Sequence, residues 1–324
     1  MSLGESVLDA IGNTPVVRLN KVSAGVKPKI YAKLEFMNPG GSVKDRIAAY
    51  LVARAERQGL LKRGGTIVEP TSGNTGVGLA MLAAVRGYKA IFTMPDKVSE
   101  EKRALLRAYG AQVVIAPTDV SPESPEHYVN VARRLQKATP HSYLPNQYEN
   151  LGNPRAHYLT TGPEIWRQTK GRIDAFVAGV GTGGTISGAG GYLKKRKKGL
   201  LVVGVEPEGS IYGAVKRGTS EPPHQYLVEG IGEDFIPGTY DPKVVDDVVT
   251  VSDSASVSMA RSLARQEGIL AGGSSGSAVA GALDLAARRP DLRLIVVILP
   301  DSGRSYLSKL YDERWLRSHG LSED

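Results

Sequence analysis

The stretch AFVAGVGTGGTISG, residues 175–188, joins a short apolar run to a turn that is rich in glycine and threonine. A continuous apolar run of this length is typical of a strand that is buried on both faces, as in a parallel sheet. The turn offers main-chain N–H groups at the start of a helix, which is a favourable place for an anion. The stretch therefore predicts a strand, an anion-binding turn and a helix, in that order.

The glycine spacing raises the question of which phosphate the turn holds. Gly179, Gly181 and Gly184 match the dinucleotide fingerprint, and Glu206 lies roughly twenty residues further on, where a ribose-binding acid is found. The spacing alone says only that N–H groups face an anion, so the rest of the chain has to decide which ligand this is.

The segments around this stretch repeat its pattern. Apolar runs rich in β-branched residues alternate with helical patterns, and two early segments, VVRL and KIYAKLE, are expected to pair as edge strands. Buried strands are expected at 66–70, 89–95, 111–117, 175–180, 200–207 and 293–300, and helices at 42–59, with Ser42 as N-cap, at 99–110 and at 257–268. This alternation predicts an α/β fold with doubly wound parallel sheets in two lobes, whose ligands bind beyond the carboxyl ends of the strands.

The composition is that of a globular protein. The chain has 324 residues with 41% hydrophobic and 23% charged residues, enough for about two domains. No apolar run approaches the roughly 18 residues of a membrane helix, and the N-terminus does not resemble a signal peptide. We therefore expect a soluble, cytoplasmic protein without a membrane partner. The absence of cysteine excludes disulfides, thiolate metal sites and a cysteine nucleophile, and no metal site is expected.

The net charge of +8 raises the possibility of a nucleic-acid partner. Its densest run, KKRKK at 194–198, lies where a helical pattern ends, and cations there interact favourably with the helix dipole. No aromatic residues interleave with the run, so a solvated helix end is favoured and no nucleic-acid partner is expected.

Lys44, in NPGGSVKDR (38–46), is expected in the opening turn of a helix, where the dipole disfavours an ammonium group. This position and partial desolvation lower the pKa of an amine, which can then form an imine with an aldehyde. The alternative is a surface lysine compensated by Asp45.

Two further loops carry neutral donors at expected helix starts. In EPTSGNTGVG (69–78), the hydroxyls of Thr71, Ser72 and Thr75 suit a small carboxylate, and the Asn74 amide suits a phenolate-like oxygen, although one of these groups would suffice as a helix cap. LAGGSSGSAV (270–279) is either a third ligand turn, with Ser274 in it, or a flexible glycine and serine turn.

From GNTPVVRL at residue 12 to PDSGRSYLSKL ending at 310, these motifs resemble the fold-type II pyridoxal-phosphate enzymes of the cysteine synthase and cystathionine β-synthase family. The resemblance implies a fold like that of the tryptophan synthase β chain, pyridoxal 5'-phosphate as cofactor and a homodimer. It implies a large phosphate-binding domain of residues 1–37 and 151–324, and a smaller mobile domain, 38–150, that carries the lysine and the carboxylate loop.

The resemblance also implies site residues. Lys44 would form the Schiff base and move protons, Asn74 would bind the 3′-oxygen of the cofactor, and Ser274 would contact its pyridine nitrogen. Residues Gly181, Thr182, Gly183, Gly184 and Thr185 would bind the phosphate, and Thr71, Ser72, Thr75 and Gln147 of NQYEN the substrate carboxylate. A single phosphate explains the two threonine hydroxyls. A dinucleotide leaves Lys44 and the other two turns without a role.

Ser274 constrains the expected reaction. A serine hydroxyl does not keep the pyridine nitrogen protonated, so the ring is a weaker electron sink and elimination of a β-substituent is favoured over a long-lived carbanion. Lys44 would remove the α-proton, a thiol would add to the resulting aminoacrylate, and closure of the smaller domain would exclude water.

Three stretches favour the cystathionine β-synthase branch of the family, namely GGSVKDR, SPES (121–124) and EPEGSI (206–211). The expected substrates are L-serine and L-homocysteine. A cysteine synthase that uses O-acetylserine or O-phosphoserine with sulfide is the near alternative, and a silent binding scaffold is less favoured. The chain begins near the catalytic core, so neither haem sensing nor effector activation through a C-terminal pair of domains is expected.

Three residues remain open in this scheme. Tyr158 is either a contact of the second substrate or its leaving water, or a packing residue. Glu229 and Asp234 of EGIGEDFIP (229–237) either line the entrance for the second substrate or belong to a solvated loop.

Overall fold

The structure is a computed structural model that describes residues 3–71, 73–96 and 98–321. The chain forms two compact units: a smaller one made of the N-terminal residues up to Ile11 and Asn38–Asn153, and a larger one made of Gly12–Met37 and the chain from Pro154 onward. The N-terminal residues were expected with the larger domain. They associate with the smaller unit because Leu8 packs against its hydrophobic core.

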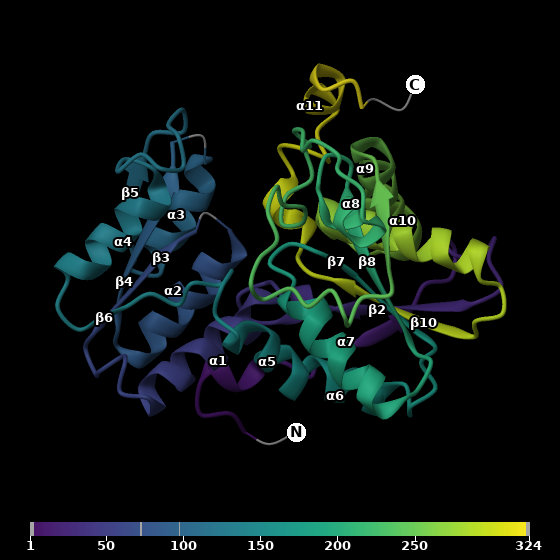
Figure 1. Cartoon of the computed structure of the whole chain (residues 1–324), viewed down its shortest axis with the longest axis horizontal. Coiled ribbons are helices and arrows are strands. Elements are labelled where there is room, and N and C mark those ends of the chain that lie inside the picture. Colours follow the sequence, from purple (N-terminus) through teal and green to yellow (C-terminus); the bar gives the residue numbers. More distant parts are fainter. Residues whose placement is uncertain (1–2, 72, 97, 322–324) are drawn as a thin grey trace. The chain divides into compact units, whose positions relative to one another are not determined.

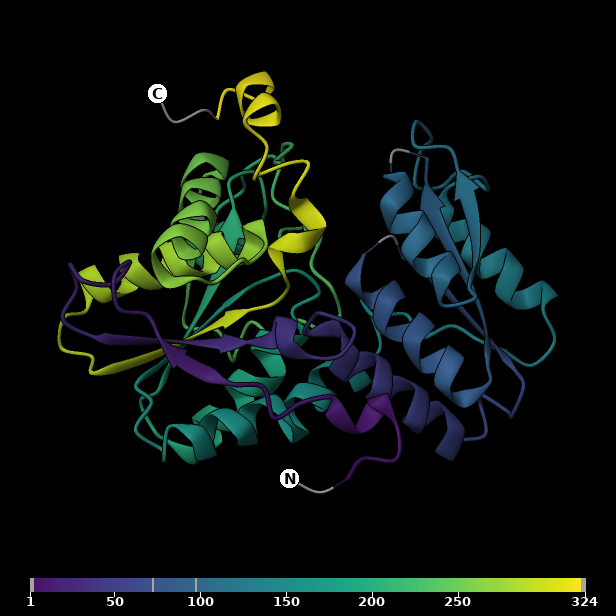
Figure 2. The same ribbon diagram turned by 180° about the vertical axis from the view of Figure 1, so that it is seen from behind.

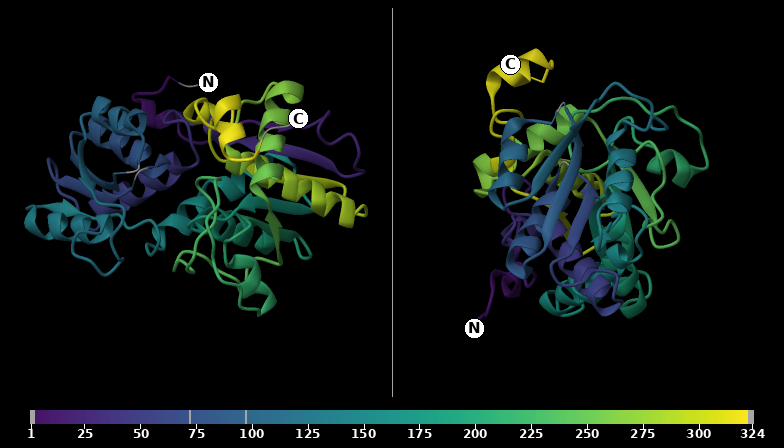
Figure 3. Two further views of the ribbon diagram at one scale, coloured as in Figure 1. Left: turned by 90° about the horizontal axis from the view of Figure 1, so that it is seen from above. Right: turned by 90° about the vertical axis from the view of Figure 1, so that its left-hand side faces the viewer.

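The smaller unit contains a four-stranded parallel sheet in the order β5-β4-β3-β6 (Figure 1; Figure 3, right, in blue). Its strands are β3 (Thr66–Pro70), β4 (Lys89–Pro95), β5 (Gln112–Ala116) and β6 (Ser142–Tyr143), and its helices are α1 (Lys44–Arg57), α2 (Asn74–Arg86), α3 (Glu100–Ala108) and α4 (Tyr128–Ala138). Helices α2 and α4 contact β3 and β4, and α1 packs on α2. Burial of Ile67, Phe92 and Leu79 fixes this core.

The larger unit contains a six-stranded sheet in the order β1-β2-β10-β7-β8-β9. Its strands are β1 (Val16–Arg18), β2 (Lys29–Leu34), β7 (Ala175–Gly179), β8 (Leu201–Pro207), β9 (Asp247–Val251) and β10 (Leu294–Leu299). Only β1 runs antiparallel to its neighbour. Figure 2 shows the β1–β2 pair in purple beside β10 in yellow.

Alternate residues of β7 enter two different cores, which shows that the larger sheet is covered on both faces. Ala175 and Val177 pack in the core that includes α10, whereas Phe176 and Ala178 pack in the core that includes α7. The helices of this part are α5 (Gly152–Leu159), α6 (Thr161–Gln168), α7 (Gly184–Arg196), α8 (Tyr212–Arg217), α9 (Asp253–Ser262), α10 (Gly273–Arg288) and α11 (Glu313–Ser318). The predicted doubly wound α/β architecture is therefore confirmed.

Two local expectations were wrong. Val43 rather than Ser42 is the N-cap of α1, although the Ser42 hydroxyl still accepts a hydrogen bond from the Lys44 N–H at 3.1 Å. The segments VVRL and KIYAKLE do pair, but β2 is not an edge strand, because β10 pairs with its other side. Among the described residues, no helix combines the length and the apolar character that a membrane span requires.

Candidate active site

Lys44 is the first residue of α1 and is partly buried. The turn before it is tied to the helix by Asp45, whose Oδ2 accepts a hydrogen bond from the Gly40 N–H at 2.6 Å. A Cβ atom on Gly40 would lie 2.4 Å from Asp45 Oδ1, so only glycine permits this approach. The structure thus places Lys44 at the positive end of a helix, on a turn of fixed shape.

The EPTSGNTGVG loop leads from β3 into α2, which begins at Asn74. Its N-cap is Gly73, and no side chain caps it; Ser72 lies outside the described residues. Thr71 accepts a hydrogen bond from the Gly73 N–H at 3.4 Å, while the Thr75 hydroxyl donates to Gln147 Oε1 at 2.6 Å.

This last contact brings together two residues that lie 72 positions apart in the sequence. Thr75 and Gln147 are both buried. Because the hydroxyl of Thr75 is used on Gln147, it does not cap the helix. The main-chain N–H groups at the start of α2, the Thr71 hydroxyl and the Nε2 group of Gln147 are among the donors that the described residues offer to a small anion here.

The glycine loop, residues 181–185, leads from β7 into α7. Gly183 is the N-cap of α7, has the left-handed φ of 81° and leaves the helix start without a side-chain cap. A Cβ atom on Gly183 would lie 2.5 Å from the Tyr240 Cβ, and one on Gly181 would lie 2.6 Å from the Gly230 carbonyl oxygen. Glycine is therefore required at both positions for conformation or for close approach.

Two hydroxyl groups donate hydrogen bonds to carbonyl oxygens of the glycine loop. Tyr212 donates to the carbonyl oxygen of Gly181, and Thr239 donates to that of Thr182. With these carbonyls occupied, the loop presents the uncapped N–H groups of α7 to a ligand. Burial raises the pKa of the Tyr240 hydroxyl to about 12, so this neighbour of Gly183 is neutral at physiological pH.

Thr185 has a partner that the sequence did not reveal. His157 is buried in α5, with Nε2 3.2 Å from Thr185 Oγ1 and Nδ1 2.8 Å from Thr161 Oγ1. If Thr185 donates its one hydroxyl proton to a ligand, Nε2 has to carry the ring proton, and Nδ1 then accepts from Thr161. His157 directly precedes Tyr158, the residue of this segment that the sequence analysis considered.

Tyr158 itself is held by ring contacts. Its ring packs edge-on against Tyr192 with 5.5 Å between centroids, and the Arg155 guanidinium carbon lies 5.2 Å from its centroid. Tyr192 lies eight residues beyond Gly184 on α7, roughly 12 Å along the helix. The structure thus brings His157, rather than Tyr158, to the glycine loop.

The serine turn forms the buried start of a helix. Helix α10 begins at Gly273 and its first residues, Ser274 among them, are buried, so the alternative of a flexible turn was wrong. Asp301 packs behind this turn, because a Cβ atom on Gly272 would lie 2.2 Å from its Oδ1. The Tyr306 hydroxyl donates to Asp301 Oδ2 at 2.7 Å and holds the carboxylate in place.

Three acidic residues that the sequence left open have defined surroundings. Glu206 Oε1 accepts from the Gly213 N–H at 2.9 Å and from the Thr250 hydroxyl at 3.0 Å, so its role is to hold the start of α8 rather than a ribose. Glu229 forms an ion pair with Lys309 at 2.5 Å, and Asp234 is exposed.

Comparisons with known proteins agree with these features. A family model described as a pyridoxal-phosphate dependent enzyme matches residues 7–301. The chain is 51% identical to a cystathionine beta-synthase of Apis mellifera, with 97% of this chain and 63% of the relative covered. It is 49% identical to that of Mus musculus, with 98% and 57% covered, and 44% identical to that of Saccharomyces cerevisiae, with 98% and 65% covered. The chain therefore spans less than two thirds of the length of these curated relatives.

Two solved structures resemble the whole chain. An O-acetylserine dependent cystathionine beta-synthase from Helicobacter pylori is 41% identical, with a TM-score of 0.87 and coverage of 95% of this chain and 99% of that chain. A hydrogen sulfide-producing enzyme from Fusobacterium nucleatum is 38% identical, with the same TM-score and coverage of 94% and 98%.

Proposed function

The chain belongs to the family of pyridoxal-phosphate-dependent enzymes, and from this premise we propose that it catalyses β-replacement. In the proposed reaction, L-serine and L-homocysteine give L-cystathionine and water. The observation that carries the proposal is the identity of 44–51% to cystathionine beta-synthases over 97–98% of this chain.

The glycine loop fits the cofactor's phosphate. Its uncapped helix start and its two threonine hydroxyls match the oxygens of a phosphate dianion, and the space beside Gly183 would not admit a side chain. We assign the phosphate to the loop from Gly181 to Thr185. When bound, pyridoxal phosphate supplies an electron sink that stabilises negative charge on the α-carbon of an amino acid.

The remaining site residues have distinct proposed roles. Lys44 would bind the aldehyde group of the cofactor through its amine and would then carry the α-proton, a role for which its place at the start of α1 and its partial burial are suited. Asn74 and Ser274 orient the ring of the cofactor through neutral side chains. Thr71, Ser72, Thr75 and Gln147 would hold the substrate carboxylate, Thr75 through its main-chain N–H because its hydroxyl donates to Gln147.

Tyr158 is proposed as a contact of the second substrate through its hydroxyl group. The variant Tyr158→Phe separates this role from ring packing, because it retains the contacts with Tyr192 and Arg155 and loses only the hydroxyl. A specific loss of activity with homocysteine, and not with sulfide, supports the role. If Tyr158→Phe changes the activity with homocysteine and the activity with sulfide equally, or changes neither, the proposed role is contradicted.

A second candidate function differs in the first substrate. The similarity to the Helicobacter pylori enzyme over nearly its full length favours O-acetylserine in place of serine. The similarity to the hydrogen sulfide-producing enzyme favours sulfide as a substrate or product. Cysteine synthesis from O-acetylserine and sulfide would use the same site. These reactions share the cofactor and the carboxylate contacts, and they differ in the leaving group of the first substrate and in the nucleophile.

Matched assays on the purified holoenzyme decide between these functions. kcat/KM is measured for serine with homocysteine, O-acetylserine with homocysteine, and O-acetylserine with sulfide, with Lys44→Ala as control. We expect the first pair to give the largest value, and the control to lack both activity and the cofactor's visible absorbance. A larger value with O-acetylserine and sulfide identifies a cysteine synthase, and a wild type that cannot be reconstituted with the cofactor refutes the enzyme assignment.

The family resemblance also supports a homodimer and a cytoplasmic location, which we propose on that basis. Light scattering tests the first: a homodimer has twice the chain mass of 34.5 kDa. Fractionation of the source cells tests the second.

A further inference from the structure

Gln147 is held at three points, all within the smaller unit. Its side-chain Oε1 accepts from the Thr75 hydroxyl at 2.6 Å, and its carbonyl oxygen accepts from Asn153 Nδ2 at 2.8 Å. Its main-chain N–H donates to Glu69 Oε1 at 3.0 Å. The third contact is unusual because it uses a buried carboxylate.

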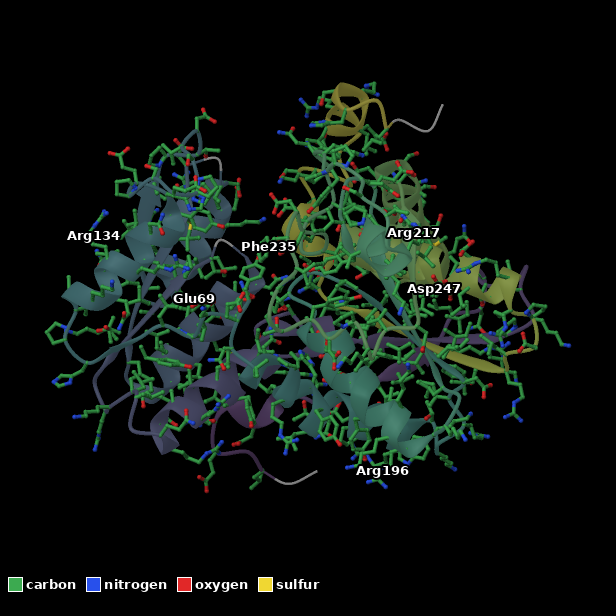
Figure 4. All side chains as sticks on the ribbon, viewed as in Figure 1. Glu69, Arg134, Arg196, Arg217, Phe235 and Asp247 are labelled. Atoms are coloured by element: carbon green, nitrogen blue, oxygen red, sulfur yellow. The ribbon has the colours of Figure 1, made fainter. Side chains whose placement is uncertain are left out.

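Glu69, labelled in Figure 4, lies near the carboxyl end of β3. Its side chain is buried, with 1% exposed. Each of its oxygens accepts one main-chain N–H, Oε1 from Gln147 and Oε2 from Asn146 at 2.8 Å. Burial raises the pKa of this carboxyl group to about 7, while the two N–H groups act in the opposite direction. Burying a carboxylate is unfavourable unless its hydrogen bonds are well made. We therefore asked what these two hydrogen bonds position.

The backbone at Asn146 explains how one carboxylate reaches both N–H groups. Asn146 has a φ of 53°, in the left-handed region that residues other than glycine seldom adopt. Such a residue next to a normal one turns successive N–H groups toward one anion. The carboxylate of Glu69 thus binds both N–H groups of a turn whose backbone is in an unfavourable conformation.

We infer that Glu69 is a positioning residue for the substrate carboxylate. By fixing the turn at Asn146 and Gln147, it sets where the side chain of Gln147 stands. Thr75 occupies the amide oxygen, so the Nε2 group is the donor that Gln147 presents to the substrate. The inference rests on the proposed function, because it takes Gln147 to bind the carboxylate of the amino-acid substrate.

The variant Glu69→Gln tests this role with little change in volume. A glutamine has one acceptor oxygen and one NH₂ group, so it can satisfy only one of the two N–H groups and opposes the other with a donor. Glu206→Gln is the matched control in the larger unit. Glu206 is also a buried carboxylate at the end of a strand and also accepts two hydrogen bonds, but from Gly213 and Thr250.

The first measurement is the Kd for L-serine, obtained by titrating the cofactor absorbance of each holoenzyme without a thiol. We expect Glu69→Gln to raise this Kd roughly five- to tenfold, the equivalent of one lost hydrogen bond, and Glu206→Gln to change it less than twofold. In the Gln147→Ala background, Glu69→Gln should raise the Kd for L-serine by less than a further twofold, because both changes act on the same contact. Independent, additive effects, or an equal effect of the control, overturn the inference.

The second measurement needs neither cofactor chemistry nor turnover. Hydrogen exchange at the amides of Asn146 and Gln147 should become at least tenfold faster in Glu69→Gln and stay unchanged in Glu206→Gln. Unchanged exchange in Glu69→Gln shows that Glu69 does not hold the N–H groups of Asn146 and Gln147, and it refutes the inference. If Glu69→Gln does not fold, Glu69→Asp is used, since it keeps the charge but is one methylene too short to reach both N–H groups.

Failure of the inference is distinguishable from failure of the proposed function. If no cystathionine forms but serine still binds with the expected pattern among variants, the proposed reaction is wrong and the role of Glu69 stands. If Gln147→Ala leaves the Kd for serine unchanged, Gln147 does not bind the carboxylate and the inference is wrong, whatever product the enzyme makes.

Discussion

Replacing Gly183 by alanine should damage the glycine loop in two ways at once. The left-handed φ of 81° costs an alanine about 1–2 kcal/mol. The new Cβ would also lie 2.5 Å from the Cβ and 2.7 Å from the Cα of Tyr240. Neither atom belongs to a flexible side-chain end, so the loop has to move, at a further cost of about 1–3 kcal/mol. We expect a total loss of about 2–5 kcal/mol in the free energy of unfolding.

The same helix provides a matched control. Gly191 lies two turns further along α7, and a Cβ atom there would have ordinary van der Waals contact with Val244 at 3.7 Å. Gly191→Ala should therefore stabilise the protein by about 0.5–1 kcal/mol, as is usual for glycine replacement inside a helix. The two variants make the same chemical change with opposite expected signs.

The assay compares urea unfolding of both variants without cofactor, and then the Kd for pyridoxal phosphate by absorbance titration. We expect Gly183→Ala to lower the unfolding midpoint and to weaken cofactor binding at least tenfold, and Gly191→Ala to raise the midpoint and leave the Kd unchanged. If Gly183→Ala matches the wild type in both measurements, neither its backbone conformation nor its contact with Tyr240 matters, and the argument for the loop is refuted.

Three other changes are predicted. Burial raises the pKa of Glu69 to about 7 from 4.5, so its protonated form contributes stability that is complete below about pH 4.5 and is lost as pH rises to about 7. Urea unfolding should show the wild type losing stability relative to Glu69→Gln between about pH 4.5 and 7. His157 should carry its ring proton on Nε2 in the holoenzyme, which ¹⁵N NMR can detect. The variant His157→Phe should raise the Kd for the cofactor several-fold, because the Thr185 hydroxyl then loses the partner that fixes its orientation. Lys33→Met should cost about 3–5 kcal/mol of unfolding free energy, because it removes the ammonium group that lies 2.9 Å from Glu164 and 3.9 Å from Glu35, two buried carboxylates.

Most strands of the two sheets could be predicted, because the burial of a strand is reflected in its own sequence, but β6 and β9 were not expected. The runs at 66–70 and 89–95 coincide with β3 and β4, and the others agree within one or two residues, because a strand buried on both faces has to be apolar throughout. The expectation of a buried strand at 111–117 was wrong, because β5 lies at the edge of its sheet and only Ala116 in it is buried. The glycine loop could be found for a similar reason. Its conformation at Gly183 and its close approach to other chain segments exclude side chains, and this leaves glycines in the sequence.

Contacts between distant segments could not be predicted in this way. Glu69 lies 77 and 78 residues before the two N–H groups that it binds, and His157 lies 28 residues before Thr185. No periodicity connects such pairs, because they meet only after the strands and helices have packed. The internal position of β2 was missed for the same reason, since its second partner, β10, is formed by residues near the other end of the chain.

The sign of the effect at Glu69 separates positioning from electrostatics. Glu69 in its ionised form is an anion in the same unit as residues proposed to bind the substrate carboxylate, so through space it can only repel that substrate. If repulsion were its main influence, Glu69→Gln would remove a negative charge and tighten the binding of serine. If it acts by holding Asn146 and Gln147, the same variant weakens binding, and it does so only while Gln147 is present.

The binding of serine should also weaken as pH falls through about 7 in the wild type, because a protonated carboxyl group turns one acceptor into a donor that faces an N–H group. The neighbouring Tyr143 hydroxyl does not interfere in this range, since burial raises its pKa as well. Tighter binding in the variant would show that the carboxylate opposes the substrate and is kept for the stability of the turn alone.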